Sequence, residues 1–203
     1  MDFIQRRKDS EIQIQEQRLT LLMDLLTETA LSTGLRRGDS NAMKLFYDSF
    51  AGLLTSVCAR YISDDDEVKD IMQEALIKIY KSASSFKFRG KGSLSAWASR
   101  IVMNEALMAL RKRRSVPIKA ELPDIPDESP EEDMEGVPAD VMMEMIRRLP
   151  DAYRTVFNLY VFEDMTHKEI AARLGIKEDS SASNLLRARR ILQKEIQQYK
   201  KNR

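Results

Sequence analysis

Apolar residues recur at steps of three and four along most of the chain, which is the spacing of a helix with one buried face. This spacing predicts helices over residues 39–62, 63–81, 94–114, 140–149, 152–162, 168–174 and 180–199. A further amphipathic segment covers residues 11–31, and its pattern indicates no more than a docking helix or a helix that binds a partner. Strand-like alternation of useful length is missing, so the predicted fold class is all-α.

Five of the six prolines fall between Pro117 and Pro138, in a stretch that is also rich in acidic residues. Residues 115–144 hold 1 basic and 10 acidic residues, a net charge of −9. Residues 1–114 hold 19 basic and 15 acidic residues, and residues 145–203 hold 13 basic and 7 acidic residues. The net charge of +1 is therefore the sum of two basic segments and one acidic segment. Proline removes backbone donors and neighbouring carboxylates repel one another, which favours an extended linker, with an acidic loop packed on a domain as the alternative.

The chain is therefore predicted to form two small helical domains joined by an acidic, proline-rich linker. The domains cover residues 35–114 and 139–203, the linker covers 115–138, and residues 1–34 form an N-terminal helical extension.

The stretch from Thr166 to Ile176 has the order of a helix-turn-helix. A short helix ends at Gly175, which can take the left-handed conformation that stops a helix. A polar turn then restarts the chain as a longer helix, which in this motif enters the major groove of DNA. The apolar side of the longer helix is predicted to hold Ala182, Leu185, Ala188, Leu192 and Ile196. Its other side supplies the candidate DNA-binding residues Ser180, Ser183, Asn184, Arg187, Arg190 and Lys194.

This second side carries no acidic residue and mixes hydrogen-bonding groups with cations. Groups in its first turns can read the edges of bases, and the later cations can contact phosphates. The alternative is an ordinary solvated basic face.

The loop from Ser84 to Ser93 interleaves two phenylalanines with three cations, and the next helix carries a stripe of aromatic, cationic and amide side chains. Aromatic faces stack on unpaired bases while cations hold the adjoining phosphates, so this arrangement suits single-stranded nucleic acid. The candidate residues are Phe88, Arg89, Lys91, Arg100, Asn104 and Arg111. The alternative is that Phe86, Phe88 and Trp97 belong to the core of a small domain.

One face of the helix after Ser63 combines polar side chains with an isoleucine, on the side opposite the buried one. The residues of this face are Asp70, Gln73, Glu74 and Ile77. An apolar side chain among polar groups on an outer face favours a contact with another protein, and a solvated face is the alternative. The acidic run from Asp64 to Glu67 is interpreted as a helix cap, because consecutive acids at a helix start cannot all point at one cation.

Several classes of protein are excluded by the composition. The chain has no run of about 18 apolar residues, so no membrane insertion is expected, and the polar N-terminus is unlike a secretory signal. A single cysteine, Cys58, and a single histidine, His167, allow no disulfide, no Cys/His metal site and no nucleophile–base pair. We therefore expect a cytoplasmic protein without catalytic residues, metal or cofactor.

Two sets of motifs resemble the sigma-70 family of bacterial sigma factors. Residues 70–80, 86–92 and 97–104 resemble the core region of these factors. Residues 149–157, 167–175 and 185–189 resemble their promoter-binding C-terminal region. The presence of only these two regions with a short linker is similar to the minimal, extracytoplasmic-function (ECF) type.

The resemblance implies a factor that is not an enzyme and that directs initiation at promoters. The face of Asp70, Gln73, Glu74 and Ile77 would dock on the clamp helices of the RNA polymerase β′ subunit, and the β flap is a further implied contact. The loop of residues 86–93 with Arg100 and Asn104 would capture flipped bases of the −10 element. The helix from Ser180 would read the −35 element, and an anti-sigma factor is an implied partner. A stand-alone DNA-binding regulator, which would need neither the face nor the loop, is the alternative.

Overall fold

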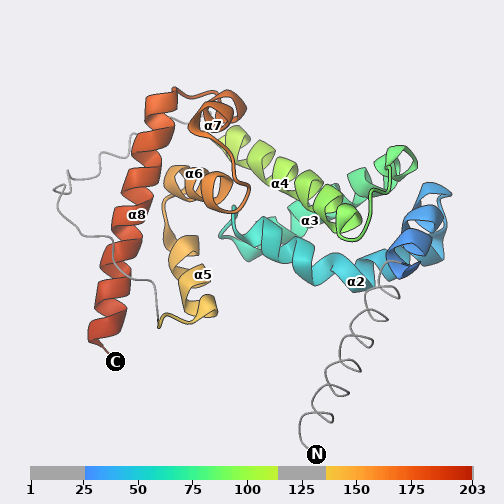
Figure 1. The fold of residues 1–203 in the computed structure, drawn as a ribbon, viewed down its shortest axis with the longest axis horizontal. Coiled ribbons are helices and arrows are strands. Elements are labelled where there is room, and N and C mark those ends of the chain that lie inside the picture. The colour runs from blue at the N-terminus through green and yellow to red at the C-terminus, as the bar shows by residue number, and fades with distance from the viewer. Residues whose placement is uncertain (1–25, 114–135, 203) are drawn as a thin grey trace, which may run out of the picture. The chain divides into compact units, whose positions relative to one another are not determined.

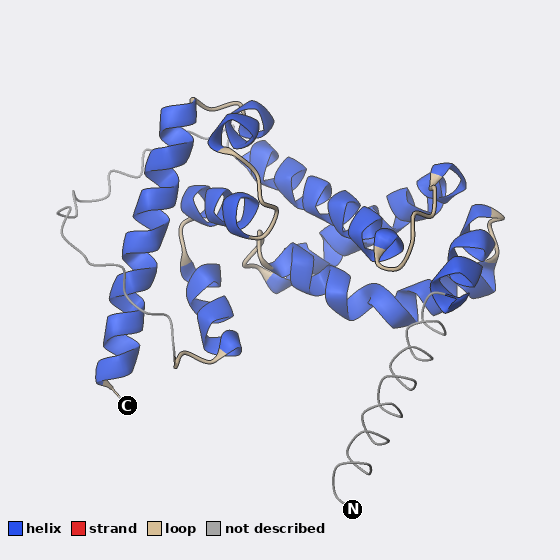
Figure 2. Ribbon diagram, viewed as in Figure 1, coloured by secondary structure: helices blue, strands red, loops and turns tan. Residues whose placement is uncertain are grey.

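The computed structural model describes residues 26–113 and 136–202, and every regular element in these two ranges is helical (Figures 1 and 2). Residues 26–36 are helical. They are followed by α2 (Ser40–Ala59), α3 (Asp65–Ser82), the short 3-10 helix η1 (Ala83–Ser85) and α4 (Ser93–Arg113). The second range holds α5 (Ala139–Arg148), α6 (Asp151–Val161), α7 (His167–Leu174) and α8 (Glu178–Lys201). The all-α prediction is confirmed, and the bounds of these helices lie within a few residues of the predicted ones.

Two predictions fall mainly on residues that the structure does not describe. Residues 115–135 of the acidic linker and residues 11–25 of the N-terminal amphipathic segment lie outside the described ranges. Contacts along the chain divide it into two compact units, Met1–Leu54 with Gln73–Val102, and Thr55–Met72 with Met103–Arg203. The domain boundaries predicted near residues 34, 114 and 138 stay a prediction.

The core of the first unit is built from the apolar faces of α2, the second half of α3 and the first half of α4. Phe46, Leu54, Ile79, Leu94 and Ala98 are fully buried in this unit. Residues 26–36 belong to the same core, because they bury two leucines, Leu31 and Leu35. Glycine is required at position 34 for close packing, since a Cβ there would lie 2.6 Å from the Ala42 Cβ.

The core of the second unit includes α6, from which Tyr153 through Leu159 are buried, and α8 packs against α5, α6 and α7. On α8 the buried positions are Ser181, Leu185, Ala188, Leu192 and Ile196. The prediction that Ala182 lies on the apolar side of this helix was wrong, because Ala182 is exposed and Ser181 is buried in its place. The Ser181 hydroxyl can be buried because it lies 3.1 Å from the Nδ1 atom of His167, which gives it a hydrogen-bond partner.

A buried arginine holds the start of α6 in the second unit. Arg154 is only 2% exposed. Its guanidinium donates to the carbonyl oxygens of Arg147 (2.6 Å), Leu149 (3.1 Å) and Tyr61 (2.8 and 3.2 Å) and to the Asp151 carboxylate (2.5 Å). Burial lowers the pKa of Arg154, and the neighbouring Asp151 charge opposes that shift. A buried cation with this many acceptors links segments that lie far apart in the sequence.

None of the helices in the described ranges combines the length and the apolar character that crossing a membrane requires.

Candidate nucleic-acid interfaces

The angle between α7 and α8 is set by a capped start and a glycine stop on α7. Thr166 and Glu169 form a reciprocal capping box, in which the Thr166 Oγ1 accepts from the Glu169 amide at 3.3 Å and Glu169 accepts from the Thr166 amide at 2.8 Å. Hydrogen bonds from Thr166 lower the pKa of Glu169. At the other end, Gly175 has φ 66° and ψ 38°, and the amide of Ile176 donates to the Ala171 carbonyl at 3.1 Å. The left-handed stop predicted at Gly175 is therefore confirmed, and the turn of a helix-turn-helix follows it.

The outer side of α8 presents the residues that the sequence proposes for duplex DNA. Ser180, Ser183, Arg187 and Lys194 are exposed, whereas Asn184 and Arg190 are half-buried. The guanidinium carbon of Arg187 lies 6.0 Å from the centre of the Tyr153 ring, so this side chain leans over an aromatic face of α6.

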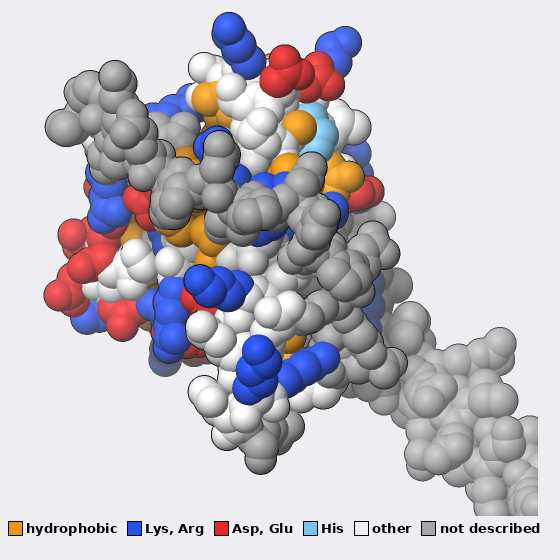
Figure 3. Space-filling view, turned by 90° about the vertical axis from the view of Figure 1, so that its left-hand side faces the viewer, with side chains coloured by type: hydrophobic (Ala, Val, Ile, Leu, Met, Phe, Trp, Pro, Cys, Tyr) orange, Lys and Arg blue, Asp and Glu red, His pale blue; other side chains and the backbone are white. Residues whose placement is uncertain are grey.

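Charge on the molecular face shown in Figure 3 is mixed. Among the side chains that are coloured by type in this view, Lys and Arg are interspersed with Asp and Glu (Figure 3).

A cavity of about 440 Å³ lies between the loop after η1 and the start of α4. It is lined by Ser85, Phe86, Lys87, Arg89, Ser93, Ala96, Trp97 and Arg100. The ring centres of Phe86 and Trp97 are 4.8 Å apart at an interplanar angle of 37°. A cavity of this size with an aromatic wall and three cations at its edge can enclose a planar, negatively charged ligand unit such as a nucleotide.

The aromatic residues near this cavity differ in burial. Phe86 is 6% exposed and belongs to the core, as the alternative interpretation proposed, while Trp97 and Phe88 are half-buried. Of the predicted single-strand residues, Arg89 and Arg100 line the cavity, but Phe88 and Lys91 do not. Lys87 and Trp97 also line the cavity, although they were not among the candidate residues predicted from the sequence.

Asn104 and Arg111 are engaged elsewhere in the second unit. Arg173 of α7 donates a hydrogen bond to the Asn104 side-chain oxygen, and Arg111 donates to the Arg173 carbonyl oxygen. These two candidates are therefore not brought to the cavity, and in this structure their polar groups face α7.

The outer face of α3 is open to solvent. Asp70, Gln73 and Glu74 are exposed, and Ile77 keeps 47% of its surface exposed. The start of the same helix is capped as expected from the acidic run, because the Asp64 Oδ1 accepts from the Glu67 amide at 2.8 Å. An exposed isoleucine one turn after the carboxylate of Glu74 suits a protein contact better than a nucleic-acid contact.

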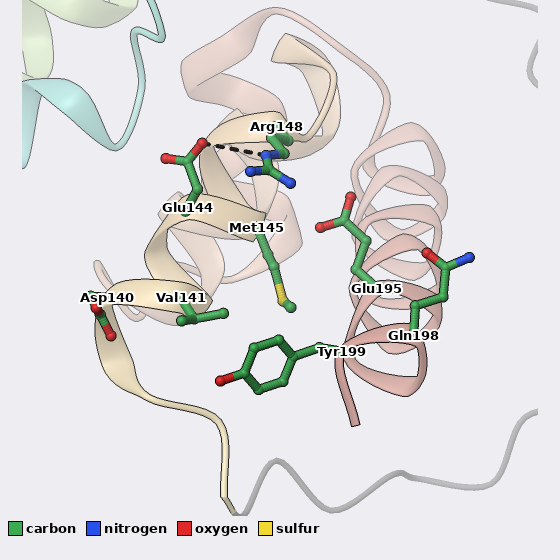
Figure 4. Close-up of a pocket in the computed structure, with 8 residues that line it drawn as sticks. All are labelled: Asp140, Val141, Glu144, Met145, Arg148, Glu195, Gln198 and Tyr199. Carbon is green, nitrogen blue, oxygen red and sulfur yellow. Dashed lines mark hydrogen bonds and ion pairs between the residues drawn. The ribbon is translucent and has the colours of Figure 1, made fainter. Parts of the chain in front are cut away.

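A second cavity, of about 500 Å³, lies between α5 and α8 (Figure 4). Asp140, Val141, Glu144, Met145, Arg148, Glu195, Gln198 and Tyr199 line it. Met145 and Tyr199 point into the space between the helices, and Arg148 pairs with Glu144 at 3.3 Å (Figure 4). Three carboxylates against one arginine repel phosphate, so this groove fits a protein segment and not DNA.

The groups that could support metal or covalent chemistry have structural surroundings. Among the residues that the structure describes, no cluster of three or more His, Cys, Asp and Glu side chains could hold a metal ion. Burial raises the pKa of the Cys58 thiol to about 12, which keeps it protonated. The imidazole of His167 stacks on the Tyr160 ring with 4.9 Å between ring centres.

Comparison with known proteins identifies two sequence families in this chain. Residues 46–116 match the family described as Sigma-70 region 2, and residues 139–192 match Sigma-70, region 4.

Related full-length proteins cover most of the chain. The RNA polymerase sigma-H factor of Pseudomonas aeruginosa is 30% identical over 179 residues, which covers 80% of this chain and 90% of that protein. The ECF RNA polymerase sigma-E factor of Haemophilus influenzae is 27% identical over 191 residues, covering 87% and 98%. Among solved structures, the sigma factor RpoE in complex with the anti-sigma factor NepR from Bartonella quintana is 22% identical, with a TM-score of 0.44 and coverage of 76% and 96%.

Proposed function

The chain belongs to the sigma-70 family of RNA polymerase sigma factors, in the extracytoplasmic-function group, and we propose how its parts divide the work of promoter-specific initiation. In this proposal α8 reads the −35 element, the loop of residues 86–93 with the start of α4 captures bases of the −10 element, and α3 holds core RNA polymerase. The cavity beside Phe86 and Trp97 is the observation that carries the proposal, because a regulator that binds only duplex DNA has no need of it.

Recognition of the −35 element is supported by the geometry of α7 and α8. The capping box at Thr166 and the left-handed Gly175 fix the short helix, so that α8 can present its first turns to the major groove. Ser180, Ser183 and Arg187 are exposed there. Arg187 would contact a guanine edge, and Arg190 and Lys194 would contact phosphates.

Recognition of the −10 element is supported by the cavity. Unpairing a base pair costs a few kcal/mol, and stacking one base on an aromatic side chain returns about 1–3 kcal/mol. Trp97 supplies the aromatic wall, and Arg89 and Arg100 supply cations for the phosphates. Phe88, Lys91, Asn104 and Arg111 would join this surface only after the loop and the Arg173 contacts rearrange.

No catalysis is needed from a protein that works in this way. Capture of unpaired bases offsets the free energy of melting, and the chemistry of RNA synthesis belongs to the polymerase. Its place of action is then the cytoplasm, where core polymerase and promoter DNA are found.

Two surfaces are available for core polymerase. The face of Asp70, Gln73, Glu74 and Ile77 would dock on the β′ clamp helices, and the acidic groove between α5 and α8 offers a place for the β flap. An anti-sigma factor that covers these same faces would keep the protein inactive. In this proposal the domains cover residues 35–114 and 139–203.

The experiment compares two exposed apolar residues of the first unit in their effect on core binding. Fully burying an isoleucine is worth about 2 kcal/mol, and Ile77 has 47% of its surface left to bury, which is worth about 1 kcal/mol. We therefore expect Ile77→Ser to weaken binding of the full chain to core polymerase about fivefold. Leu45→Ser on α2 is the matched control, since Leu45 is 50% exposed and lies outside the proposed face. Equal binding by both variants would refute the α3 contact, and failure of the wild-type protein to bind core polymerase would favour a stand-alone regulator.

A further inference from the structure

The N-terminus of α4 lacks a side-chain cap of its own. The residue before its first residue, Ser93, is Gly92, which has no side chain to accept a hydrogen bond. The first turn of α4 also holds no acidic residue. A helix start leaves backbone amides without acceptors inside the helix, so these amides need an acceptor from another part of the chain.

Glu28 supplies that acceptor from 64 and 66 residues away in the sequence. Its Oε2 accepts from the Gly92 amide at 2.7 Å, and its Oε1 accepts from the Leu94 amide at 2.9 Å. Both carboxylate oxygens are thus used, and the side chain is buried with 9% exposure. A carboxylate at the N-terminal end of a helix is also favoured by the helix dipole.

The segment that carries Glu28 is fixed on the first unit. Leu31 and Leu35 are buried on the same helical segment, and the Gly34 contact brings its backbone close to Ala42 of α2. Because burying a carboxylate is costly unless it is paired, Glu28 has a defined position and not a chance surface contact.

The junction that Glu28 holds connects the loop on one side of the cavity to α4 on the other. Gly90 and Gly92 have φ values of 116° and 82°, a conformation that glycine adopts readily and that leaves the loop end with little intrinsic stiffness. Local bonds add support, from the Arg89 amide to the Ser93 hydroxyl at 3.1 Å and from the Ser93 amide to the Gly90 carbonyl at 3.1 Å. The two hydrogen bonds that Glu28 accepts reach this junction from 64 and 66 residues away in the sequence.

We propose that Glu28 is a positioning residue for recognition of the −10 element. It touches no DNA and sets the loop that carries Lys87 and Arg89 against the α4 wall that carries Trp97 and Arg100. The inference rests on the proposed function of this cavity. It assigns to a residue outside the matched region 2 segment a role in shaping the single-strand site.

The test uses holoenzyme reconstituted from core polymerase and the full chain. Glu28→Ala removes both acceptors, and Glu28→Gln keeps one carbonyl oxygen while its amide group opposes the second backbone amide. Binding is measured separately to a single-stranded −10 oligonucleotide, to a −35 duplex and to core polymerase. We expect Glu28→Ala to weaken −10 binding about tenfold or more, since small misplacements of binding groups have effects up to a hundredfold. Glu28→Gln should fall between Glu28→Ala and wild type, and Asp48→Ala, which removes one exposed acid from the same unit, should match wild type.

Amide hydrogen exchange and a second variant separate the possible failures. Faster exchange of the Gly92 and Leu94 amides in Glu28→Gln, with −35 and core binding unchanged, supports the inference. Unchanged −10 binding in both Glu28 variants overturns it, and so does an equal loss in all three binding assays, which would mean a general role in folding. Arg100→Ala tests the cavity itself: if this variant weakens −10 binding while the Glu28 variants do not, only the inference fails. If Arg100→Ala also binds the −10 strand normally, the proposed function of the cavity fails together with the inference.

Discussion

Arg154 gives the sharpest test of how the second unit is held together. Replacing it with methionine keeps most of the apolar stem and removes the guanidinium. The change leaves the carbonyl oxygens of Tyr61, Arg147 and Leu149 without their Arg154 donor. It also removes the cation that lies 2.5 Å from the Asp151 carboxylate, whose second cation, Arg113, lies farther away at 3.9 Å. Tyr61 lies on the turn between α2 and α3, Arg147 lies in the last turn of α5, and Leu149 lies on the connection to α6, so all three places are loosened at once.

The size of the effect follows from the burial of each partner. Removing one member of a buried ion pair costs about 3–5 kcal/mol. The Asp151 side chain is 45% exposed and regains water, which argues for the lower end of that range. The carbonyl oxygens matter more, since a buried acceptor left unpaired costs about 1–3 kcal/mol. We therefore expect Arg154→Met to lower the free energy of unfolding by about 3 kcal/mol.

Urea denaturation followed by far-ultraviolet circular dichroism measures this difference. With a slope of about 2 kcal/mol per molar urea, the midpoint should fall by about 1.5 M. The matched control is Arg148→Met, because Arg148 is exposed and its ion pair with Glu144, one turn earlier in the same helix, is worth about 0.3–0.5 kcal/mol. Equal midpoints for Arg154→Met and Arg148→Met would mean that the buried contacts of Arg154 do not form in solution.

Three further predictions concern the helix-turn-helix. Gly175→Ala should destabilise the protein by about 1–2 kcal/mol in thermal unfolding, because its φ of 66° is strained for alanine. No atom lies within 4 Å of the added Cβ, so this cost comes from the backbone and not from a clash. Gly52→Ala inside α2 is the control and should not destabilise the protein, and equal melting temperatures for the two variants would contradict the left-handed stop. Thr166→Ala should cost about 1 kcal/mol at neutral pH. The pKa of Glu169 is lowered in the folded state, so the stability that its carboxylate contributes is complete above pH 4.5 and is lost as pH falls through the folded-state pKa. The difference in unfolding free energy between Thr166→Ala and wild type should therefore narrow in acid. A difference that stays constant with pH would contradict the capping box. Arg187→Ala should weaken binding of the holoenzyme to promoter DNA by about 1–3 kcal/mol and relax base selection at one −35 position. Unchanged base selection would mean that Arg187 does not read a base.

Features that depend on neighbouring residues could be predicted from the sequence. The bounds of the main helices, the cap at Asp64 and the left-handed stop at Gly175 were all predicted, and the structure confirms them. Each of these is decided within one or two helical turns, by periodicity, by a side-chain oxygen or by the freedom of glycine.

Features that depend on distant partners could not be predicted. Ser181 replaces Ala182 on the buried side of α8 because His167 gives it a partner, which the pattern of α8 alone does not reveal. Glu28 and Arg154 look like ordinary charged residues in amphipathic helices. Only the fold brings their partners close, which are the Gly92 amide, 64 residues from Glu28, and the Tyr61 carbonyl, 93 residues from Arg154. Asn104 and Arg111 were assigned to the single-strand face from their spacing on α4, whereas the structure pairs them with Arg173.

We propose that this protein, bound to core polymerase, recognises a duplex element and a melted element of one promoter. The most direct measurement is single-round transcription on a pool of promoter fragments, with permanganate detection of unpaired thymines. Core polymerase is expected to start at a shared −35 and −10 pattern only when the protein is present, and unpaired thymines should then appear at the −10 element. Arg100→Ala should reduce the reactivity of these thymines, and Arg187→Ala should alter −35 selection. Start sites and thymine reactivity that stay the same without the protein would contradict this proposal.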